Sequence, residues 1–262
     1  MKECIGTLDC NFNGLQGNIR SGIYETIDLV EDSNDFCILP NDNFLLTNFF
    51  TTKTLRVYDE NFVFIKNVTK INNIDIFPFS VETNKINRIY INDYGRHIIM
   101  TDLNFNYLGH YGPDKLKTAY YMLFHKNLLY ICDYGDQCIV VLDSILNLRL
   151  KYYLDIKPIQ IQILNNLACV VPQKEDNFMY FYDLDNFTVK YKYDKCPRIV
   201  VHQDKFYCLK ESQIKCYDKT GLLTDTIFLG RVKGCNNSDT PFMKIKEDKL
   251  FIKRFESQLF VL

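Results

Sequence analysis

The chain has 262 residues, of which 47% are hydrophobic and 24% charged, and its formal net charge is −1. This composition predicts a globular protein with a sizeable core, arranged as one large all-β domain or two small domains. The near-zero charge supplies no global attraction for nucleic acid or acidic membrane, although it does not exclude a local basic patch. The N-terminus lacks the apolar stretch of a signal peptide, and no apolar run reaches membrane-spanning length. We therefore expect a soluble, cytoplasmic protein.

One motif recurs along the chain: a short apolar run, a polar break, a second apolar run, and then usually Asp. Its copies, in chain order, are Phe44–Asp59, Ile89–Asp102, Leu129–Asp143, Leu167–Asp183, Phe206–Asp218 and Leu250–Leu262. The second and third copies share Tyr-Ile-x-Asp-Tyr-Gly at the same place. Successive terminal aspartates are 43, 41, 40 and 35 residues apart, and the Glu-Ser-Gln shared by the last two copies gives a final step of 45 residues. A period of this length defines a repeat architecture.

Further strand-like segments flank each motif. Apolar or alternating runs precede the six copies at residues 36–40, 79–82, 121–125, 159–164, 198–202 and 242–246. Others follow the first five copies at 61–68, 104–111, 146–154, 186–193 and 222–229. Four strands in each period, with no helix-length amphipathic segment between them, predict the blades of a propeller. We expect an all-β, six-bladed β-propeller.

The predicted boundaries make residues 1–262 a single domain. After an N-terminal segment, 1–35, the blades cover approximately 36–74, 75–116, 117–157, 158–195, 196–236 and 237–262. The last blade stops after its third strand, and a strand from the N-terminus is expected to complete it and close the ring, because an open edge favours aggregation. The favoured closing strand is Gly22–Val30, and the alternative is Thr7–Leu15, which resembles the turn between the third and fourth strands of other blades.

The ten cysteines are Cys4, Cys10, Cys37, Cys132, Cys138, Cys169, Cys196, Cys208, Cys216 and Cys235. None forms a Cys-x-x-Cys pair, and their spacing from the histidines is not that of a zinc finger. Several interrupt apolar strand-like runs, where a thiol behaves as a small hydrophobic group. We expect buried free thiols and no structural metal.

The second copy, carried by Asp93, Gly95, Arg96, Ile98 and Asp102, resembles an NHL repeat, and Asp133, Gly135, Ile139 and Asp143 repeat the pattern. The resemblance is good in the second and third blades and partial elsewhere. It implies a propeller of the NHL/TolB-like kind, similar to the C-terminal domains of TRIM-NHL proteins. In those proteins the propeller recruits partners or RNA, while a separate RING carries the ubiquitin-ligase activity. The Cys/His spacing of a RING or B-box is missing from this chain.

Loops between the second and third strands of a propeller share one face of the ring, and binding residues concentrate on such loops. Asp93 and Asp133 fit turn caps or partners of nearby donors, and Tyr94, Arg96 and Tyr134 suit stacking on bases or peptide side chains. The predicted partner-binding residues on this face are Lys53, Tyr94, Arg96, His97, Tyr134, Gln137, Lys174, Lys210, Lys253 and Arg254.

No catalytic residue, metal ligand or cofactor is predicted. The histidines are His97, His110, His125 and His202. Of these, His125 and His202 occupy equivalent positions after first strands. A zinc site of the propeller type would need three converging histidines. The leading hypothesis is a non-enzymatic scaffold that recognises a protein partner or substrate, as in TRIM-NHL ubiquitin ligases. The alternatives are a propeller that binds single-stranded RNA and, on analogy of fold alone, a metal-dependent hydrolase or lyase.

Overall fold

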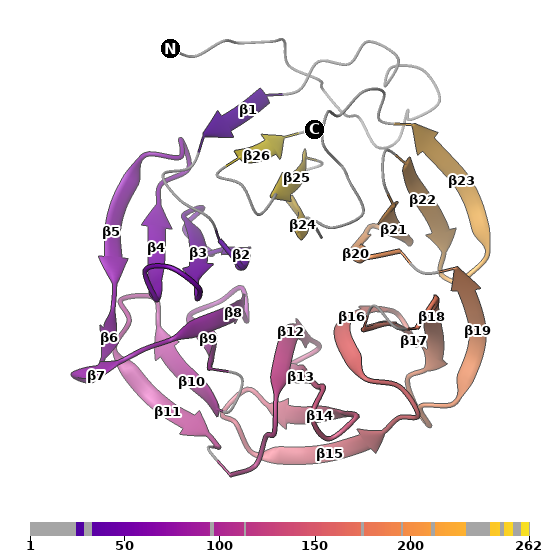
Figure 1. Cartoon of the computed structure of the whole chain (residues 1–262), viewed down its shortest axis with the longest axis horizontal. Coiled ribbons are helices and arrows are strands. Elements are labelled where there is room, and N and C mark those ends of the chain that lie inside the picture. The colour runs from indigo at the N-terminus through magenta and orange to yellow at the C-terminus, as the bar shows by residue number, and fades with distance from the viewer. Residues whose placement is uncertain are drawn as a thin grey trace. The chain divides into compact units, whose positions relative to one another are not determined.

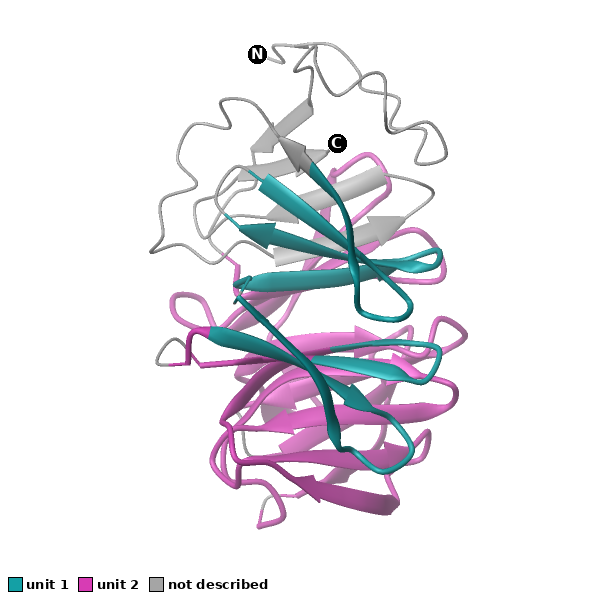
Figure 2. Ribbon diagram, turned by 90° about the vertical axis from the view of Figure 1, so that its right-hand side faces the viewer, with its two compact units in different colours: residues 1–32, 162–169, 178–262 teal, residues 33–161, 170–177 magenta. Residues whose placement is uncertain are grey.

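The computed structural model of the chain describes residues 25–28, 33–94, 97–112, 114–173, 176–194, 196–210, 213–228, 242–246, 249–253 and 258–261. Within these ranges the strands form six four-stranded antiparallel sheets and one two-stranded hairpin (Figure 1). No helix there is long and apolar enough to cross a membrane. The chain divides into two compact units (Figure 2): unit 2 contains residues 33–161 and 170–177, and unit 1 contains residues 1–32, 162–169 and 178–262.

Unit 2 contains three complete sheets, in each of which every strand pairs with the next along the chain. The first sheet is formed by β2 (Asp35–Ile38), β3 (Phe44–Asn48), β4 (Thr54–Tyr58) and β5 (Phe64–Val68). The second is formed by β8 (Pro78–Thr83), β9 (Arg88–Asp93), β10 (His97–Asp102) and β11 (Tyr107–Tyr111). The third is formed by β12 (Ala119–His125), β13 (Leu128–Asp133), β14 (Cys138–Asp143) and β15 (Leu148–Tyr153). The first strands lie side by side, since β8 contacts both β2 and β12.

The fourth sheet draws residues from both units and is formed by β16 (Pro158–Leu164), β17 (Leu167–Pro172), β18 (Phe178–Asp183) and β19 (Val189–Asp194). Unit 1 contains a sheet of β20 (Arg198–His202), β21 (Lys205–Lys210), β22 (Gln213–Asp218) and β23 (Leu223–Phe228). The last sheet contains β24 (Phe242–Lys246), β25 (Lys249–Lys253), β26 (Gln258–Val261) and β1 (Glu25–Asp28). Strand β1 pairs antiparallel with β26, with Glu25 opposite Val261 and Asp28 opposite Gln258.

The strands expected before, within and after each motif are found in the structure. Five sheets are described with nearly all of their side chains, so the structure shows five blades where the sequence predicted six. The sheet of β24, β25, β26 and β1 is described through its backbone pairing alone, and the alternative closing segment, Thr7–Leu15, lies outside the described residues. A hairpin of β6 (Lys70–Ile71) and β7 (Ile74–Asp75) was not predicted. Its turn residues, Asn72 and Asn73, have φ of 52° and 61°, the conformation that two-residue hairpin turns require.

Alternate residues of the inner strands face two different cores. On β9, Ile89 and Ile91 pack with residues of the first sheet, whereas Tyr90 packs with residues of the third. On β10, Ile98 faces the core shared with the third sheet and Ile99 the core shared with the first. A sheet buried on both faces has continuous apolar strands rather than alternating ones. This explains why the middle strands of the repeats read as uninterrupted apolar runs.

The described cysteines are buried free thiols, as predicted. Cys4, Cys10 and Cys235 lie outside the described residues. Burial, followed by the charge of Asp133, raises the pKa of Cys138 to about 11. Burial likewise raises the pKa of Cys132 well above its usual value. Thiols of this kind stay protonated and serve as small core groups.

The aspartate that ends each repeat shapes the turn between the third and fourth strands. In the first five repeats its Oδ1 accepts the N–H two residues further on and, in all but the fourth, also the N–H four residues on. Each turn contains a residue of positive φ, namely Phe62, Phe105, Leu146, Phe187 and Gly221. The ladder shifts register beside each turn. The repeated Asp therefore caps a bulged hairpin.

Asp102→Ala is expected to destabilise the chain by about 1–2 kcal/mol, because the N–H groups of Asn104 and Asn106, each 2.9 Å from Oδ1, lose their acceptor. Asp102→Asn keeps a carbonyl oxygen there and should cost less. Burial works to raise the pKa of Asp102, but hydrogen bonds from Asn106 and Asn104 outweigh it and lower this pKa below 3.8.

A carboxyl group with a lowered pKa in the folded state stabilises the protein above its unfolded pKa, and this contribution disappears as the pH falls through the folded pKa. The advantage of wild type over Asp102→Asn should therefore shrink below about pH 3.8, the usual carboxyl value. Urea unfolding followed by circular dichroism between pH 7 and pH 3 would measure both effects. Equal stability of the wild type and Asp102→Ala at pH 7 would show that the cap contributes nothing.

Candidate functional site

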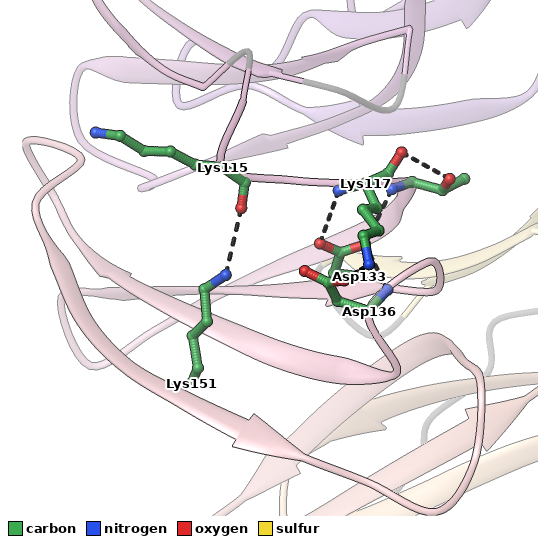
Figure 3. Close-up of polar contacts among 6 residues, drawn as sticks. Lys115, Lys117, Asp133, Asp136 and Lys151 are labelled. Carbon is green, nitrogen blue, oxygen red and sulfur yellow. Dashed lines mark hydrogen bonds and ion pairs between the residues drawn. The ribbon is translucent and has the colours of Figure 1, made fainter.

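Buried carboxylates at the ends of β9 and β13 hold the segments that enter the first strand of the same sheet. Asp93 Oδ1 accepts the N–H of Phe77. Asp133, which is fully buried, accepts the N–H of Lys117 at Oδ2 and that of Thr118 at Oδ1, both at 3.0 Å (Figure 3). The prediction that Asp93 and Asp133 act as partners of nearby donors is confirmed. They join the end of a second strand to the chain that enters the first strand of the same sheet.

In the first four sheets, the residue directly after the second strand is fixed by its own N–H. These bonds run from Phe49 to Asn34 Oδ1 at 2.7 Å, from Tyr94 to the carbonyl of Phe77 at 2.9 Å, from Tyr134 to that of Thr118 at 2.9 Å and from Gln173 to that of Lys157 at 3.0 Å. Tyr94 also has a φ of 56°, in the left-handed region. The backbone is therefore held in place at four equivalent positions of unit 2, namely Phe49, Tyr94, Tyr134 and Gln173.

Aromatic side chains connect these anchored positions into what we call the aromatic row: Phe49, Phe77, Phe79, Tyr94, Tyr120 and Tyr134. Ring centroids are 6.1 Å apart for Phe77 and Tyr94, 5.8 Å for Tyr94 and Phe49, 5.6 Å for Phe49 and Phe79, 5.2 Å for Phe79 and Tyr120, and 5.3 Å for Tyr120 and Tyr134. Each edge-to-face or offset pair contributes about 0.5–1.5 kcal/mol beyond its buried area. The row is therefore a continuous and stiff apolar strip that crosses all three sheets of unit 2.

A lysine lies at each end of the aromatic row. Lys53 Nζ lies 5.0 Å from the centroid of Phe77, and Lys157 Nζ lies 5.1 Å from that of Tyr134. Both side chains are exposed, and neither forms an ion pair with any residue that the structure describes. The Tyr134 hydroxyl donates to Gln173 Oε1 at 2.6 Å. Cation–π contacts hold the two ammonium groups beside the rings without neutralising them.

The polar groups between the two ends of the row carry no net charge. Burial, followed by the proximity of Tyr134, raises the pKa of Tyr120, so its phenol stays neutral. Lys117 pairs with Asp136 at 2.6 Å (Figure 3), and the hydrogen bond that Lys117 donates to Asp136 raises the pKa of Lys117. This loop contributes an ion pair but no unbalanced charge.

The structure brings three of the predicted partner-binding residues to one surface, because Tyr94 and Tyr134 belong to the aromatic row and Lys53 lies at its end. His97 instead contacts Asp93, with Nε2 2.9 Å from Oδ2, and Nδ1 is buried without a hydrogen-bond partner. Gln137 is exposed, with a φ of 51°, and its carbonyl accepts the N–H of Leu154 at 2.8 Å.

The other predicted residues do not join this surface in the described part of the chain. Lys210 ends β21 in unit 1. Lys253 ends β25, where only the backbone is described, and Arg96, Lys174 and Arg254 lie outside the described residues. For these positions partner binding stays a prediction.

Sequence reasoning missed Phe49, Phe77, Phe79, Tyr120 and Lys157. Their positions carried a signal, because aromatic residues stand directly after a second strand at Phe49 and at the entry to first strands at Phe77, Phe79 and Tyr120. The predicted surface was confined to the loops between second and third strands, which contain Phe49 but not the entering segments. The entering segments meet those loops through the bonds to Asp93 and Asp133.

No family model matches the sequence, that of the NHL repeat included, and no curated protein matches it. Solved structures do match. The structure of a streptogramin B lyase superposes with a TM-score of 0.66 at 12% identity, over 88% of this chain and 80% of that one. The fold is a β-propeller.

Two more distant likenesses agree with this fold. The computationally designed Ika8 protein has a TM-score of 0.56 at 10% identity, over 87% of this chain and 70% of that one. BamB from Moraxella catarrhalis has a TM-score of 0.53 at 8% identity, over 84% of this chain and 66% of that one. At these identities the likeness establishes the propeller architecture, and the chemistry has to be argued from the site.

Possible metal ligands are dispersed through the described ranges, where no group of three or more His, Cys, Asp or Glu could hold a metal ion. His125 and His202 are the last residues of β12 and β20, the equivalent positions that were predicted. Burial, followed by the charge of Lys126, lowers the pKa of His125, so this imidazole is neutral at pH 7. The metal-dependent hypothesis therefore gains no donor set from these residues.

Asp133→Asn is expected to destabilise the protein by about 1–3 kcal/mol, because its single carbonyl oxygen can serve only one of the N–H groups of Lys117 and Thr118. The matched control is Asp136→Asn, which removes the neighbouring ion pair of exposed Lys117 and should destabilise the protein much less, because solvent screens that pair. Urea unfolding monitored by circular dichroism measures both. If the two variants unfolded at the same urea concentration, the carboxylate of Asp133 would not be the anchor described above.

Proposed function

We propose that this propeller is a protein-recognition module whose partner binds across the aromatic row. By its resemblance to TRIM-NHL propellers, it would supply the substrate-recognition step of a ubiquitin ligase whose catalytic RING comes from elsewhere. We also propose a cytoplasmic location. It is supported by the described cysteines, which form no disulfide, because disulfides are rare in reducing compartments.

The observation that carries the proposal is a rigid strip of rings in which Tyr94 is exposed and the other five are partly buried. Tyr94 is 54% exposed although its backbone is fixed, and the neighbouring Phe50 is 68% exposed. Phe50 packs on the row through Phe49, with ring centroids 5.2 Å apart. Aromatic side chains dominate the energy of protein interfaces because they bury a large area at little cost in side-chain entropy. A pre-ordered aromatic strip beside polar loops has the anatomy of such an interface.

The single-stranded RNA alternative is less well supported by this geometry. Bases stack on free aromatic faces, and the backbone needs a groove with several cations. Here the rings pack against one another, as in the 85° edge-to-face contact of Phe79 with Tyr120. The described cations beside the row that lack an ion-pair partner are Lys53 and Lys157. Two cations give a weak salt dependence rather than the steep one typical of nucleic-acid binding.

Tyr94→Ala and Tyr134→Ala should each weaken partner binding at least about tenfold, as expected for aromatic hot-spot residues. Proximity labelling in cells would compare the wild type, the two variants and Tyr153→Ala. Tyr153 is the matched control, because it is a 73% exposed tyrosine of β15 that is not part of the row. Partners lost in both row variants and retained with Tyr153→Ala support the proposal, and unchanged partner lists contradict it. Tight, salt-sensitive binding of a twelve-nucleotide oligouridine would favour the RNA alternative instead.

We further propose that the six four-stranded sheets are six blades and that β1 closes the ring. The antiparallel pairing of β1 with β26, across four residue pairs, supports this proposal. So does the chain order, in which β24, β25 and β26 supply one sheet with three consecutive strands and β1 supplies the fourth. Pairing of this kind joins the two ends of the chain in one sheet and removes an open edge.

Deletion of residues 1–30 should lower the midpoint of thermal unfolding by about 10 °C or more, since the ladder of β1 is lost at roughly 1 kcal/mol per hydrogen bond. Deletion of residues 1–20 is the matched control, because it retains β1 and removes Thr7–Leu15, the alternative closing segment. Thermal unfolding would then distinguish the two segments. If the shorter deletion were as damaging as the longer one, closure by β1 would be wrong.

A further inference from the structure

We infer that the partner segment recognised by the aromatic row is an extended acidic peptide, with apolar side chains at its centre and carboxylates toward both ends. This inference rests on the proposed function, since it specifies the chemistry of a ligand for the same surface. It follows from the order of groups along the row and from the balance of charge around it.

The contacts make the row an unbroken series of rings. Each ring touches the next, and a lysine caps both ends, in the sequence Lys53, Phe77, Tyr94, Phe49, Phe79, Tyr120, Tyr134 and Lys157. The strip passes over the ends of three sheets in unit 2. An extended chain can follow such a strip, with alternate side chains directed at it, whereas a compact ligand would contact only part of it.

The acids that surround the row are already engaged. Asp93 accepts the N–H of Phe77 and contacts His97, and Asp133 accepts two backbone N–H groups. Asp136 pairs with Lys117 at 2.6 Å. The carboxylates of Asp93, Asp133 and Asp136 are therefore occupied by groups of the protein itself.

The cations at the ends are not engaged in this way. Lys53 and Lys157 are exposed, and in the described part of the chain each contacts a ring rather than a carboxylate. Holding an ammonium group over a ring limits its freedom and leaves its charge available, which lowers the entropic cost of pairing it with a ligand carboxylate. A basic peptide would instead meet two uncompensated positive charges. Charge complementarity thus selects an acidic segment over a basic one.

A random twelve-residue peptide library displayed on phage, selected on the purified full-length chain, tests this inference. We expect enriched sequences to carry Asp or Glu on both sides of an apolar core. Synthetic fluorescent versions of these peptides would then be titrated by fluorescence anisotropy. Binding should weaken about five- to tenfold in Lys53→Glu and in Lys157→Glu, and should weaken when the salt concentration is raised.

The matched control is Lys66→Glu. Lys66 Nζ also lies over a ring, 4.9 Å from the centroid of Phe105, and its side chain is exposed on β5, away from the row. It should leave the affinity unchanged. A charge swap provides a gain-of-binding test. Peptides with Lys or Arg in place of their acidic residues should recover binding to the double variant Lys53→Glu/Lys157→Glu.

The outcomes separate this inference from the proposed function. Neutral or basic peptides whose binding is lost in Tyr94→Ala and Tyr134→Ala would overturn the acidic ligand and leave protein recognition by the row intact. Peptides whose binding survives both tyrosine substitutions would count against the row itself. Failure to enrich any sequence, or equal effects of Lys53→Glu, Lys157→Glu and Lys66→Glu, would also overturn the inference.

Discussion

Burial of both faces of each sheet is the constraint on which the architecture of unit 2 depends. A sheet with one wet face can alternate apolar and polar residues, but β9 and β10 have a core on either side and cannot. Ile89 and Ile91 pack toward one neighbouring sheet, while Tyr90 packs toward the other. Each sheet is therefore stabilised by its neighbours rather than by itself. Unpaired backbone polar groups cannot enter these apolar cores. They lie at the ends of the strands, together with the segments that enter each first strand.

Those strand ends have to be tied together, and the ties produce the candidate site. Asp133 is fully buried because it satisfies two N–H groups of the entering segment that would otherwise lack partners. Between the sheets, Asn92 Nδ2 donates to the carbonyls of Ala119 and Tyr120 at 2.9 and 2.7 Å, and Thr47 Oγ1 donates to that of Phe79 at 3.1 Å. These bonds set the positions of Phe79 and Tyr120, so the structural ties also align the rings.

The strands and their order were predictable from the sequence because each repeat contains residues that mark its turns. Each terminal Asp encodes a hydrogen-bonded turn, which is a local property that spacing alone reveals. The prediction that Asp93 and Asp133 have donor partners is also confirmed, although their donors in the entering segments lie 15 or 16 residues earlier in the chain rather than in the local turn. The hairpin of β6 and β7 was overlooked although Asn72 and Asn73 are a recognisable turn pair, since it lies inside a connection between two repeats.

The candidate surface was predictable only in part, because it depends on contacts between segments far apart in the chain. Tyr94 and Tyr134 belonged to a visible motif, whereas Phe79 joins them only through rings on other strands, such as Tyr120. Likewise, nothing local to Lys157 shows that its side chain lies over Tyr134, and His97 looked available until its contact with Asp93 was seen. A repeat shows which residue types lie in equivalent loops. It does not show which residues of the entering segments contact them.

Divergence among the repeats explains why the site is confined to unit 2. The second strands of the second and third repeats end in Asp-Tyr-Gly, which supplies both the carboxylate anchor and the ring. In the first repeat Phe49 supplies the ring, whereas Asn48 Oδ1 accepts the N–H groups of Thr51 and Thr52 in its own loop rather than those of the entering segment. The fourth repeat retains only the backbone bond of Gln173, and the fifth reaches Lys210 with neither group. A repeat that keeps its core but loses the anchor and the ring still builds the propeller, and it no longer contributes to the strip. The aromatic row therefore ends where the motif does, and Lys157 closes it at the junction with the fourth sheet.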